Sequence, residues 1–369
     1  MKICAVETFL VQSPLHRPFV TALRTVHTVQ SVIVKMTAEN GLIGWGEAVP
    51  THVITGDSIG SIRYAIEQVL VPELIGQDLT RREQLFERMQ RVIVGNSSAK
   101  AALDMAIHDL LGQLCGLPLV QLLGGYRESL TTDVTVSVAT PTDMANEAAE
   151  CMAKGFTTLK VKVGTGTLQE ERERIRAIRQ EIGPDVILRL DANQGWQPKE
   201  AIRIIRQLED DGLNIELIEQ PVVADDIEGM CEVTRQTQTL IMADESIFST
   251  VDARKLLELR AVNLLNIKLM KSGGIREALK INTMAEAHGI ECMVGSMMET
   301  AVGVTAAAHF AASQSNITRI DLDAPLLLAD RFANGGIQYN GAVMEFGSDA
   351  GLGLDSAQMM QWVKEHACE

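Results

Sequence analysis

Charged residues at the ends of short apolar segments are the residues of this sequence best placed to do chemistry. Five such segments follow one another at intervals of 24 to 29 residues. Their charged members are Lys160, Lys162, Asp191, Glu219, Asp244 and Lys268. The interval fits one strand plus one helix, with charge at the carboxyl end of each strand. A single acid there is usually a helix cap or a surface residue, but five consecutive units predict a catalytic ring at the mouth of a barrel.

Three of these residues are carboxylates from adjacent predicted strands. Without a cation, three clustered negative charges would repel one another and raise each other's pKa values. Oxygen ligands favour a hard cation, and Mg²⁺ commonly binds a few carboxylates while keeping positions for water or substrate. We therefore expect Asp191, Glu219 and Asp244 to be the ligands of one Mg²⁺ ion.

The lysines flank this predicted ion from the second and the sixth strand. Side chains alternate along a strand, so Lys160 and Lys162 point to the same side. An unperturbed lysine has a pKa of about 10.4, and a second lysine and a divalent cation nearby are expected to bring the base toward roughly 7 to 8. Two bases that face each other across one carbon can remove a proton from one face and return it to the other. This chemistry suits epimerisation or racemisation next to a carboxylate.

The set Lys-x-Lys, Asp, Glu, Asp, Lys resembles the enolase superfamily and, within it, the muconate-lactonising-enzyme-like subgroup. The resemblance covers nearly the whole chain. It implies an α/β fold in which a (β/α) barrel, a modified TIM barrel, carries the metal and the catalytic residues. In such a site Lys162 and Lys268 would be the acid/base pair, and Lys160 would add positive charge at the substrate carboxylate.

The segments before the predicted barrel indicate a separate α+β capping domain. Residues 3–11 and 31–36 have the composition of strands, and residues 62–123 have a helical pattern. The connections 16–28 and 51–58 are candidate lid loops, although ordinary surface loops would look the same. By resemblance, the C-terminal segment folds back and completes the capping domain. The expected divisions are 1–125 for the capping domain with its lid loops, 126–323 for the barrel and 324–369 for the C-terminal segment.

The last predicted barrel strand ends in two acids, Asp321 and Asp323, which share one side. In a pocket that already binds an anion, a second carboxylate pair favours a cationic substrate group. The pair resembles the dipeptide epimerases, in which it receives the ammonium group of the N-terminal amino acid. Arg24 resembles the arginine that pairs with the glutamate side chain in Ala-Glu epimerases, and its planar fork can hold a carboxylate through two hydrogen bonds. The resemblance implies L-Ala-D/L-Glu as the substrate, and a role in peptidoglycan peptide metabolism.

Other pocket contacts and other activities are open at this stage. Thr135 and Ser296 are further candidates for substrate contacts, and by resemblance Phe19 and Ile54 would help a lid to exclude water. The alternative activities are o-succinylbenzoate synthase, N-acylamino acid racemase, muconate cycloisomerase, a dipeptide epimerase of another specificity, or a barrel that binds peptidoglycan fragments without turnover. The first three act on substrates without a free ammonium group, so the aspartate pair argues against them.

Composition excludes several classes of partner. The net charge of −15 over 369 residues disfavours nucleic acids and anionic membrane surfaces, which select for basic patches. The six cysteines have no C-x-x-C spacing and are expected to be buried thiols. No apolar segment is long enough to span a membrane, and the N-terminus lacks the core of a signal peptide. We expect a cytoplasmic enzyme with a small-molecule dipeptide substrate, and the sequence leaves a homo-oligomer open.

Overall fold

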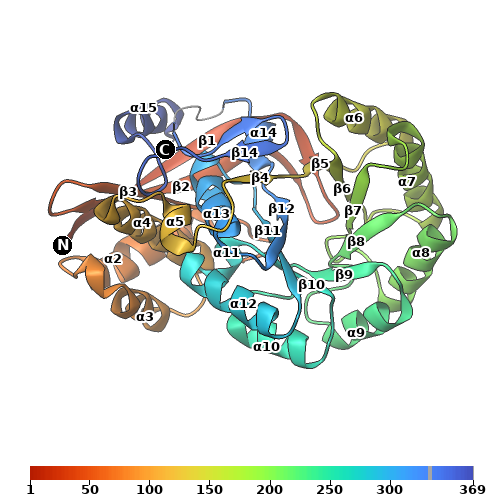
Figure 1. Cartoon of the computed structure of the whole chain (residues 1–369), viewed down its shortest axis with the longest axis horizontal. Helices are drawn as coiled ribbons and strands as arrows, with labels where there is room; N and C mark the ends of the chain where they lie inside the picture. Colours follow the sequence, from red (N-terminus) through yellow and green to blue (C-terminus); the bar gives the residue numbers. More distant parts are fainter. Residues whose placement is uncertain (331–334, 369) are drawn as a thin grey trace.

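The structure is a computed structural model that describes residues 1–330 and 335–368. An eight-stranded parallel sheet with helices around it forms a near-complete barrel, and antiparallel strands and helices of the N-terminal part lie to one side of it (Figure 1). The predicted fold class, a (β/α) barrel with a capping domain, is confirmed. The domain limits at 125 and 323 stay predictions.

The barrel strands run in sequence order around the sheet, from β5 to β12. They are β5 (Val134–Val136), β6 (Thr158–Lys162), β7 (Ile187–Asp191), β8 (Ile215–Glu219), β9 (Leu240–Ala243), β10 (Leu264–Ile267), β11 (Glu291–Gly295) and β12 (Ile317–Asp321). In the parallel register Lys162 is level with Asp191, and Asp191 is level with Glu219. Strand pairing therefore brings the charged ends to one height on one rim of the sheet.

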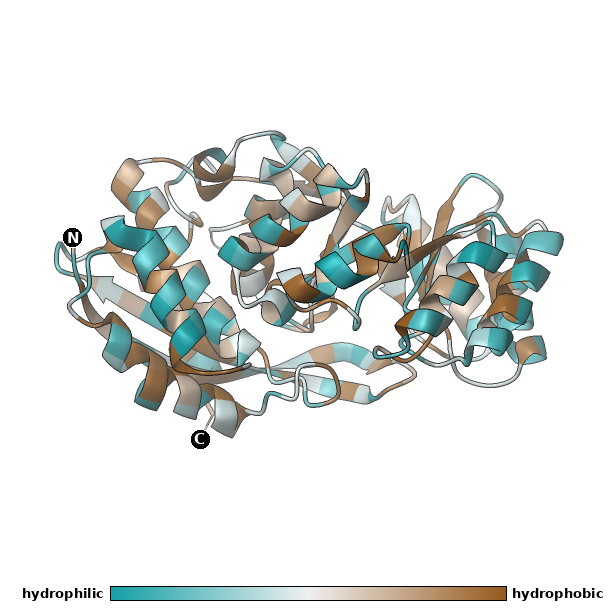
Figure 2. Ribbon diagram, turned by 90° about the horizontal axis from the view of Figure 1, so that it is seen from below, coloured by the Kyte–Doolittle hydropathy of each residue, from teal (hydrophilic) through white to brown (hydrophobic). Residues whose placement is uncertain are grey.

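Helices connect these strands and cover the outside of the sheet. They are α6 (Pro141–Ala153), α7 (Leu168–Ile182), α8 (Pro198–Asp210), α9 (Ile227–Gln236), α10 (Thr250–Glu258), α11 (Leu269–Ser272), α12 (Ile275–Ala287), α13 (Ala301–Ser313) and α14 (Ala324–Leu327). Helix α7 shows why such segments fold locally: Thr167 and Glu170 form a capping box at its start, and Ile175, Ile178 and Ile182 bury one face. The helices of the outer layer accordingly carry both hydrophilic and hydrophobic residues (Figure 2).

The barrel is closed without a regular ladder between its first and last strands. Strands β5 and β12 end the strand order and share no ladder in the described residues. Three single hydrogen bonds join them instead: Asp133 N to Ile320 O at 3.2 Å, Leu322 N to Thr132 Oγ1 at 2.9 Å, and Thr135 N to Asp323 Oδ2 at 2.7 Å. Two of these three bonds use a side chain as the acceptor, so the seam between β5 and β12 depends on the side chains of Thr132 and Asp323.

The capping domain begins with a long antiparallel sheet. Its strands are β1 (Ile3–Val20), β2 (Thr25–Ala38) and β3 (Ile43–Ala48). Residues 16–28, predicted to be a loop, are mostly strand: Phe19 pairs with Val26 and Val20 with Thr25, although the register shifts between Pro14 and Phe19. The prediction was wrong because pairing across the turn outweighs the polar composition. A hairpin therefore carries Arg24, while residues 51–58 do form a turn-rich connection.

Helices of the capping domain pack on one face of this sheet. They are α1 (Ile59–Tyr64), the π-helical turn η1 (Ala65–Leu70), α2 (Val71–Leu74), the 3-10 turn η2 (Leu79–Arg81), α3 (Arg82–Val92), α4 (Ser97–Cys115) and α5 (Leu119–Leu123). Helix α4 approaches β3 so closely that a Cβ atom at Gly46 would stand 1.9 Å from the carbonyl oxygen of Ala102. Only glycine fits this contact.

Two acids of the capping domain cap helices of the barrel. Asp104 on α4 accepts hydrogen bonds from Ile275 N at 2.7 Å and Arg276 N at 3.3 Å, at the start of α12. Glu47 on β3 accepts from Thr300 N at 2.9 Å and Gly303 N at 2.8 Å, at the start of α13. Helix N-termini leave N–H groups without partners and favour negative charge. These caps fix the capping domain to the barrel.

The C-terminal segment contributes to both parts of the molecule. Its elements are β13 (Gln338–Asn340), β14 (Val343–Glu345) and α15 (Ser356–His366), and β14 pairs with β4 (Ser129–Thr131). Helix α15 packs on the capping sheet: Met359 and Trp362 join Val11 and Trp45 in one apolar cluster, and Trp45 Nε1 donates to Ser356 Oγ at 3.0 Å. Helix α15 was not predicted from the sequence.

Two expectations from composition can be compared with the structure. No helix in residues 1–330 or 335–368 combines the length and apolar character that a membrane span needs. All six cysteines are free thiols. Cys151, Cys231 and Cys292 are buried as expected, but Cys4 and Cys115 are exposed, so the prediction of buried thiols was wrong for these two.

We expect His309 to make stability fall in mild acid. Its ring, buried on α13, accepts a hydrogen bond from Val120 N at 2.9 Å, and burial lowers its pKa from 6.5 to about 3. Between these pH values the unfolded chain binds the proton and the folded chain does not, so folding stability falls as pH falls. The loss from this group is about 2 kcal/mol at pH 5.

Urea unfolding at pH 7 and pH 5 measures this loss. A His309→Gln variant should lose less stability between the two pH values than the parent. Exposed His288 provides the control, since His288→Gln should leave the difference unchanged. Equal pH dependence in parent and His309→Gln would contradict the prediction.

Candidate active site

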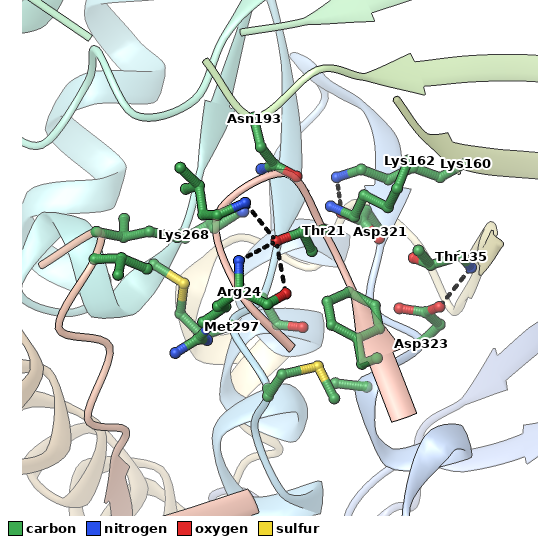
Figure 3. A pocket seen from close by; sticks show the side chains of 17 residues that line it. Thr21, Arg24, Thr135, Lys160, Lys162, Asn193, Lys268, Met297, Asp321 and Asp323 are labelled. Atoms are coloured by element: carbon green, nitrogen blue, oxygen red, sulfur yellow. Dashed lines mark hydrogen bonds and ion pairs between the residues drawn. The ribbon is translucent and has the colours of Figure 1, made fainter. Parts of the chain in front are cut away.

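A pocket lies between the carboxyl ends of the barrel strands and the hairpin of the capping domain (Figure 3). Eight residues predicted from the sequence line it: Arg24, Thr135, Lys160, Lys162, Lys268, Ser296, Asp321 and Asp323. Phe19 and Ile54, the expected lid residues, line it as well. The expected metal ligands lie directly behind the lysines, where each contacts at least one lysine ammonium group. The structure thus brings every predicted site residue to one place.

Lys162 and Lys268 enter the pocket from opposite sides. Lys162 ends β6 and Lys268 directly follows β10, and these strands are four positions apart in the eight-stranded sheet. Figure 3 shows the two side chains on opposite sides of the pocket. Lys162 Nζ lies 2.6 Å from Asp191 Oδ2, and Lys268 Nζ lies 2.8 Å from Asp244 Oδ2. Each predicted base is therefore held by one of the predicted metal ligands.

Lys160 lies at the centre of the carboxylates. Its buried Nζ is 2.7 Å from Asp321 Oδ2, 2.7 Å from Glu219 Oε2 and 3.1 Å from Asp191 Oδ2. Burial alone would lower the pKa of Lys160, but these carboxylates outweigh it and raise the pKa well above 10.5. A fixed positive charge therefore stands at the base of the pocket.

The same balance raises the pKa of Lys268, where burial is outweighed mainly by Asp244. For Lys160 and Lys268 this effect is opposite to the expected shift toward neutrality. That expectation relied on the charge of a divalent cation, whereas the carboxylates by themselves stabilise the ammonium form. The expected shift, which includes the charge of a bound cation, stays a prediction.

The three expected metal ligands have unequal acidities. Burial, together with repulsion from Asp191, raises the pKa of Glu219 to about 7. Burial also acts on Asp191, but Lys162 and Lys160 outweigh it and lower the pKa to about 2. Lys268 and Lys271 lower the pKa of Asp244 in the same way. Glu219 is thus the acid whose negative charge is least compensated by the protein.

The donor set fits a hard divalent cation. Lysine ammonium groups lie among these carboxylates. In the described residues, no three acidic, histidine or cysteine side chains are arranged as a ready metal site. Glu219 Oε2 is buried and forms an ion pair with Lys160. It has no hydrogen-bond partner among the described residues. Oxygen atoms of this kind are the ligands that Mg²⁺ prefers. Asp191, Glu219 and Asp244 are therefore suited to hold Mg²⁺.

Asp321 and Asp323 form an acidic end of the pocket. Lys160 compensates Asp321 and, against burial, lowers its pKa. Asp323 has no lysine contact of this kind; burial and the neighbouring Asp321 raise its pKa to about 6, although Thr135 N donates to it. A cationic ligand group placed between the two would relieve this repulsion.

Arg24 provides positive charge at the hairpin end of the pocket. Burial lowers the pKa of its guanidinium group. Among the described residues no carboxylate forms an ion pair with it, so its donors are available to a ligand carboxylate. The pocket thus combines an acidic end and a basic end.

Sequence reasoning missed two residues of the site. Asn193 lines the pocket, and its buried Oδ1 has no hydrogen-bond partner in the described chain. It lies two positions after Asp191, so the alternation that grouped the other pairs could have identified it. Lys271 donates to the carbonyl oxygen and to Oδ1 of Asp244, the latter at 2.5 Å, and to Asn266 O at 3.1 Å. Its distance of one helical turn from Lys268 was the available signal.

Fold and site together define a barrel protein with two lysines on opposite sides of a carboxylate-rich pocket. The chain belongs to the mandelate racemase/muconate lactonizing enzyme family: residues 4–124 match the N-terminal domain of that family, and residues 143–359 match the domain described as enolase C-terminal domain-like. The resemblance noted in the sequence is confirmed.

Solved and characterised relatives are similar over the full length. An L-Ala-D/L-Glu epimerase of Bacillus subtilis is 54% identical over 365 residues, which cover 99% of this chain and 100% of the relative. The structure of a substrate-liganded complex of that epimerase superposes with a TM-score of 0.95 at 55% identity, over 96% of this chain and 98% of the other. A dipeptide epimerase of Enterococcus faecalis, complexed with Mg and L-Leu-L-Tyr, gives a TM-score of 0.93 at 46% identity, over 96% and 99% of the two chains.

We expect Lys271→Met to destabilise the barrel. The substitution removes the donor to Asp244 and leaves a buried carboxylate with one lysine fewer, which should lower the free energy of unfolding by about 3 kcal/mol. Chemical denaturation measures the change. Exposed Lys199 is the control, since Lys199→Met should stay within about 0.5 kcal/mol of the parent. A Lys271→Met protein as stable as the parent would show that Lys271 does not hold Asp244.

Proposed function

We propose that the chain is a Mg²⁺-dependent dipeptide epimerase that acts on L-Ala-D/L-Glu. The observation that carries the proposal is a single pocket with two lysines on opposite sides, an acidic pair at one end and an unpaired arginine at the other. The identity of 54% to an L-Ala-D/L-Glu epimerase over the full length supports the same substrate. The cytoplasmic location expected from the sequence stays a prediction.

Lys162 and Lys268 are the acid/base pair of the proposed reaction. One lysine removes the α-proton of the C-terminal residue, and the other returns a proton to the opposite face, so the configuration inverts. Lys160 stabilises the negative charge that develops on the substrate carboxylate. Asp191, Glu219 and Asp244 would hold Mg²⁺, which would supply further positive charge for the substrate carboxylate and oppose the carboxylates that keep the lysines protonated.

Recognition of the dipeptide follows from the two ends of the pocket. Asp321 and Asp323 bind the ammonium group of the N-terminal residue, and Arg24 binds the side-chain carboxylate of the glutamate. Thr135 and Ser296 contact the bound peptide. Binding at the two ends of the pocket orients the reacting carbon between the two lysines.

Incubation with L-Ala-L-Glu in D₂O with Mg²⁺ tests the proposed function. The enzyme should exchange the glutamate α-hydrogen for deuterium and form L-Ala-D-Glu, and a chelator should stop both. A barrel that binds peptide fragments without turnover would exchange nothing. A dipeptide library in the same assay would identify a different dipeptide specificity.

Asp321→Asn separates dipeptides from the substrates of related activities. Loss of one carboxylate should lower kcat/KM for Ala-Glu by about 100-fold, since an ammonium ion loses a buried charged partner. Steady-state kinetics with Ala-Glu and with N-succinyl-glutamate, which has no ammonium group, measures this. Unchanged dipeptide kinetics would remove the reason for choosing a dipeptide and favour o-succinylbenzoate synthase, N-acylamino acid racemase or muconate cycloisomerase activity.

Single lysine variants should uncouple the two half-reactions. Lys162→Ala and Lys268→Ala should each lower epimerisation at least about 1,000-fold, because inversion needs both bases. Each variant should still exchange the α-hydrogen of the one enantiomer that faces its remaining lysine. NMR in D₂O with L-Ala-L-Glu and L-Ala-D-Glu measures exchange and epimerisation separately. Parental epimerisation by either variant would refute the two-base mechanism.

Arg24→Met should change specificity and leave chemistry intact. Without the guanidinium group, KM for Ala-Glu should rise about tenfold or more, while Ala-Met, which has no side-chain carboxylate, should be affected less. The ratio of kcat/KM for the two dipeptides in parent and variant is the measurement. A ratio that does not change would place the glutamate side chain elsewhere.

A further inference from the structure

The pocket wall next to Lys268 is a short segment that joins the barrel to the capping domain. Ser296, Met297 and Met298, named here the wall segment, line the pocket between the end of β11 and the start of α13. The segment starts beside the base, since a Cβ atom at Gly295 would stand 3.1 Å from Cε of Lys268. Its position therefore decides the space left for substrate next to this lysine.

Two buried carboxyl groups hold this segment. Glu299 Oε1 accepts a hydrogen bond from Met297 N at 2.8 Å, and its Oε2 is buried without a hydrogen-bond partner among the described residues. Glu47, from β3 of the capping domain, accepts from Thr300 Oγ1 at 2.7 Å and from Ser31 Oγ at 2.5 Å, besides capping α13. The proposed reaction assigns no step to Glu47 or Glu299.

The two carboxyl groups lie against the same glycine. A Cβ atom at Gly303 would stand 2.3 Å from Glu299 Oε2 and 3.0 Å from Glu47 Oε2. Two negative charges this close in a buried place would repel strongly. Glu47 accepts hydrogen bonds from four donor groups, whereas Glu299 accepts one among the described residues.

We propose that Glu47 and Glu299 form a carboxyl pair that joins the capping domain to the barrel and fixes the wall segment, so that Glu299 is a positioning residue for the bound dipeptide. Glu299 carries the proton of this pair. The statement about the dipeptide rests on the proposed function, and the statement about the pair does not.

The acidity of Glu299 agrees with this charge distribution. Burial, followed by the charge of Glu47, raises its pKa to about 8, while the Met297 amide and Lys268 act in the opposite direction. Glu299 is therefore protonated at neutral pH. Because the unfolded chain releases this proton near pH 4.5, the folded state loses stability as pH rises from 4.5 to 8.

Three variants test the pair. Glu299→Gln keeps the acceptor for Met297 N and is neutral at all pH values, Glu299→Ala removes the acceptor, and Glu286→Gln makes the same change at an exposed site of α12. The first readout needs no substrate. Amide hydrogen exchange at Met297 should become at least about tenfold faster in Glu299→Ala and stay at the parental rate in Glu299→Gln.

Thermal unfolding between pH 5 and pH 8 gives a second readout. Glu299→Gln should gain melting temperature relative to the parent as pH rises through this range, because it never carries the repelled charge, and Glu286→Gln should not. The proposal is overturned if Glu299→Gln and the parent change in parallel, or if Met297 exchange is unaffected by Glu299→Ala.

Kinetics with Ala-Glu tests the positioning role. Glu299→Ala should raise KM about tenfold with kcat within about twofold of the parent, and Glu299→Gln should restore KM. An unchanged KM in Glu299→Ala would reduce Glu299 to a structural residue. If the parent shows no epimerisation at all, the proposed function fails, and hydrogen exchange and unfolding still test the pair on their own.

Discussion

Buried ion pairs between lysines and carboxylates at the strand ends determine the geometry of the whole site. Charges of this kind lose their hydration when they are buried, and only good mutual pairing offsets that loss. Lys160 meets three carboxylates at 2.7 to 3.1 Å, while Lys162 and Lys268 each meet one. Removal of one member leaves its partner buried with one charged contact fewer. The strand register, which sets Lys162, Asp191 and Glu219 level, is therefore constrained by electrostatics as well as by the apolar core.

The capping domain covers the charged strand ends and forms one side of the pocket. Its hairpin reaches over the barrel mouth and supplies Phe19 and Arg24, and its acids Glu47 and Asp104 cap two barrel helices. Both capped helices follow strands whose ends line the pocket. Contacts that fix the domains to each other are therefore the same contacts that fix the walls of the pocket.

Much of the site could be predicted because it depends on short-range rules. The spacing from Lys160 to Lys268 identified the βα units, and strand alternation grouped Asp321 with Asp323. Arg24 was found only by resemblance, because no local pattern marks a hairpin tip as part of a distant pocket. The strand character of residues 16–20 and 25–28 was missed, because it comes from pairing across the turn. The roles of Glu47 and Glu299 depend on contacts between residues more than 250 positions apart.

The seam of the barrel gives Asp323 two partners of different kinds. Its Oδ2 atom accepts a hydrogen bond from the Thr135 amide, which helps to join the first and last strands, and the same carboxyl group lines the pocket. A ligand ammonium group that binds Asp323 therefore contacts the same carboxyl group that helps to close the barrel. Asp323 therefore belongs both to the pocket lining and to the closure of the barrel, so a substitution there acts on both.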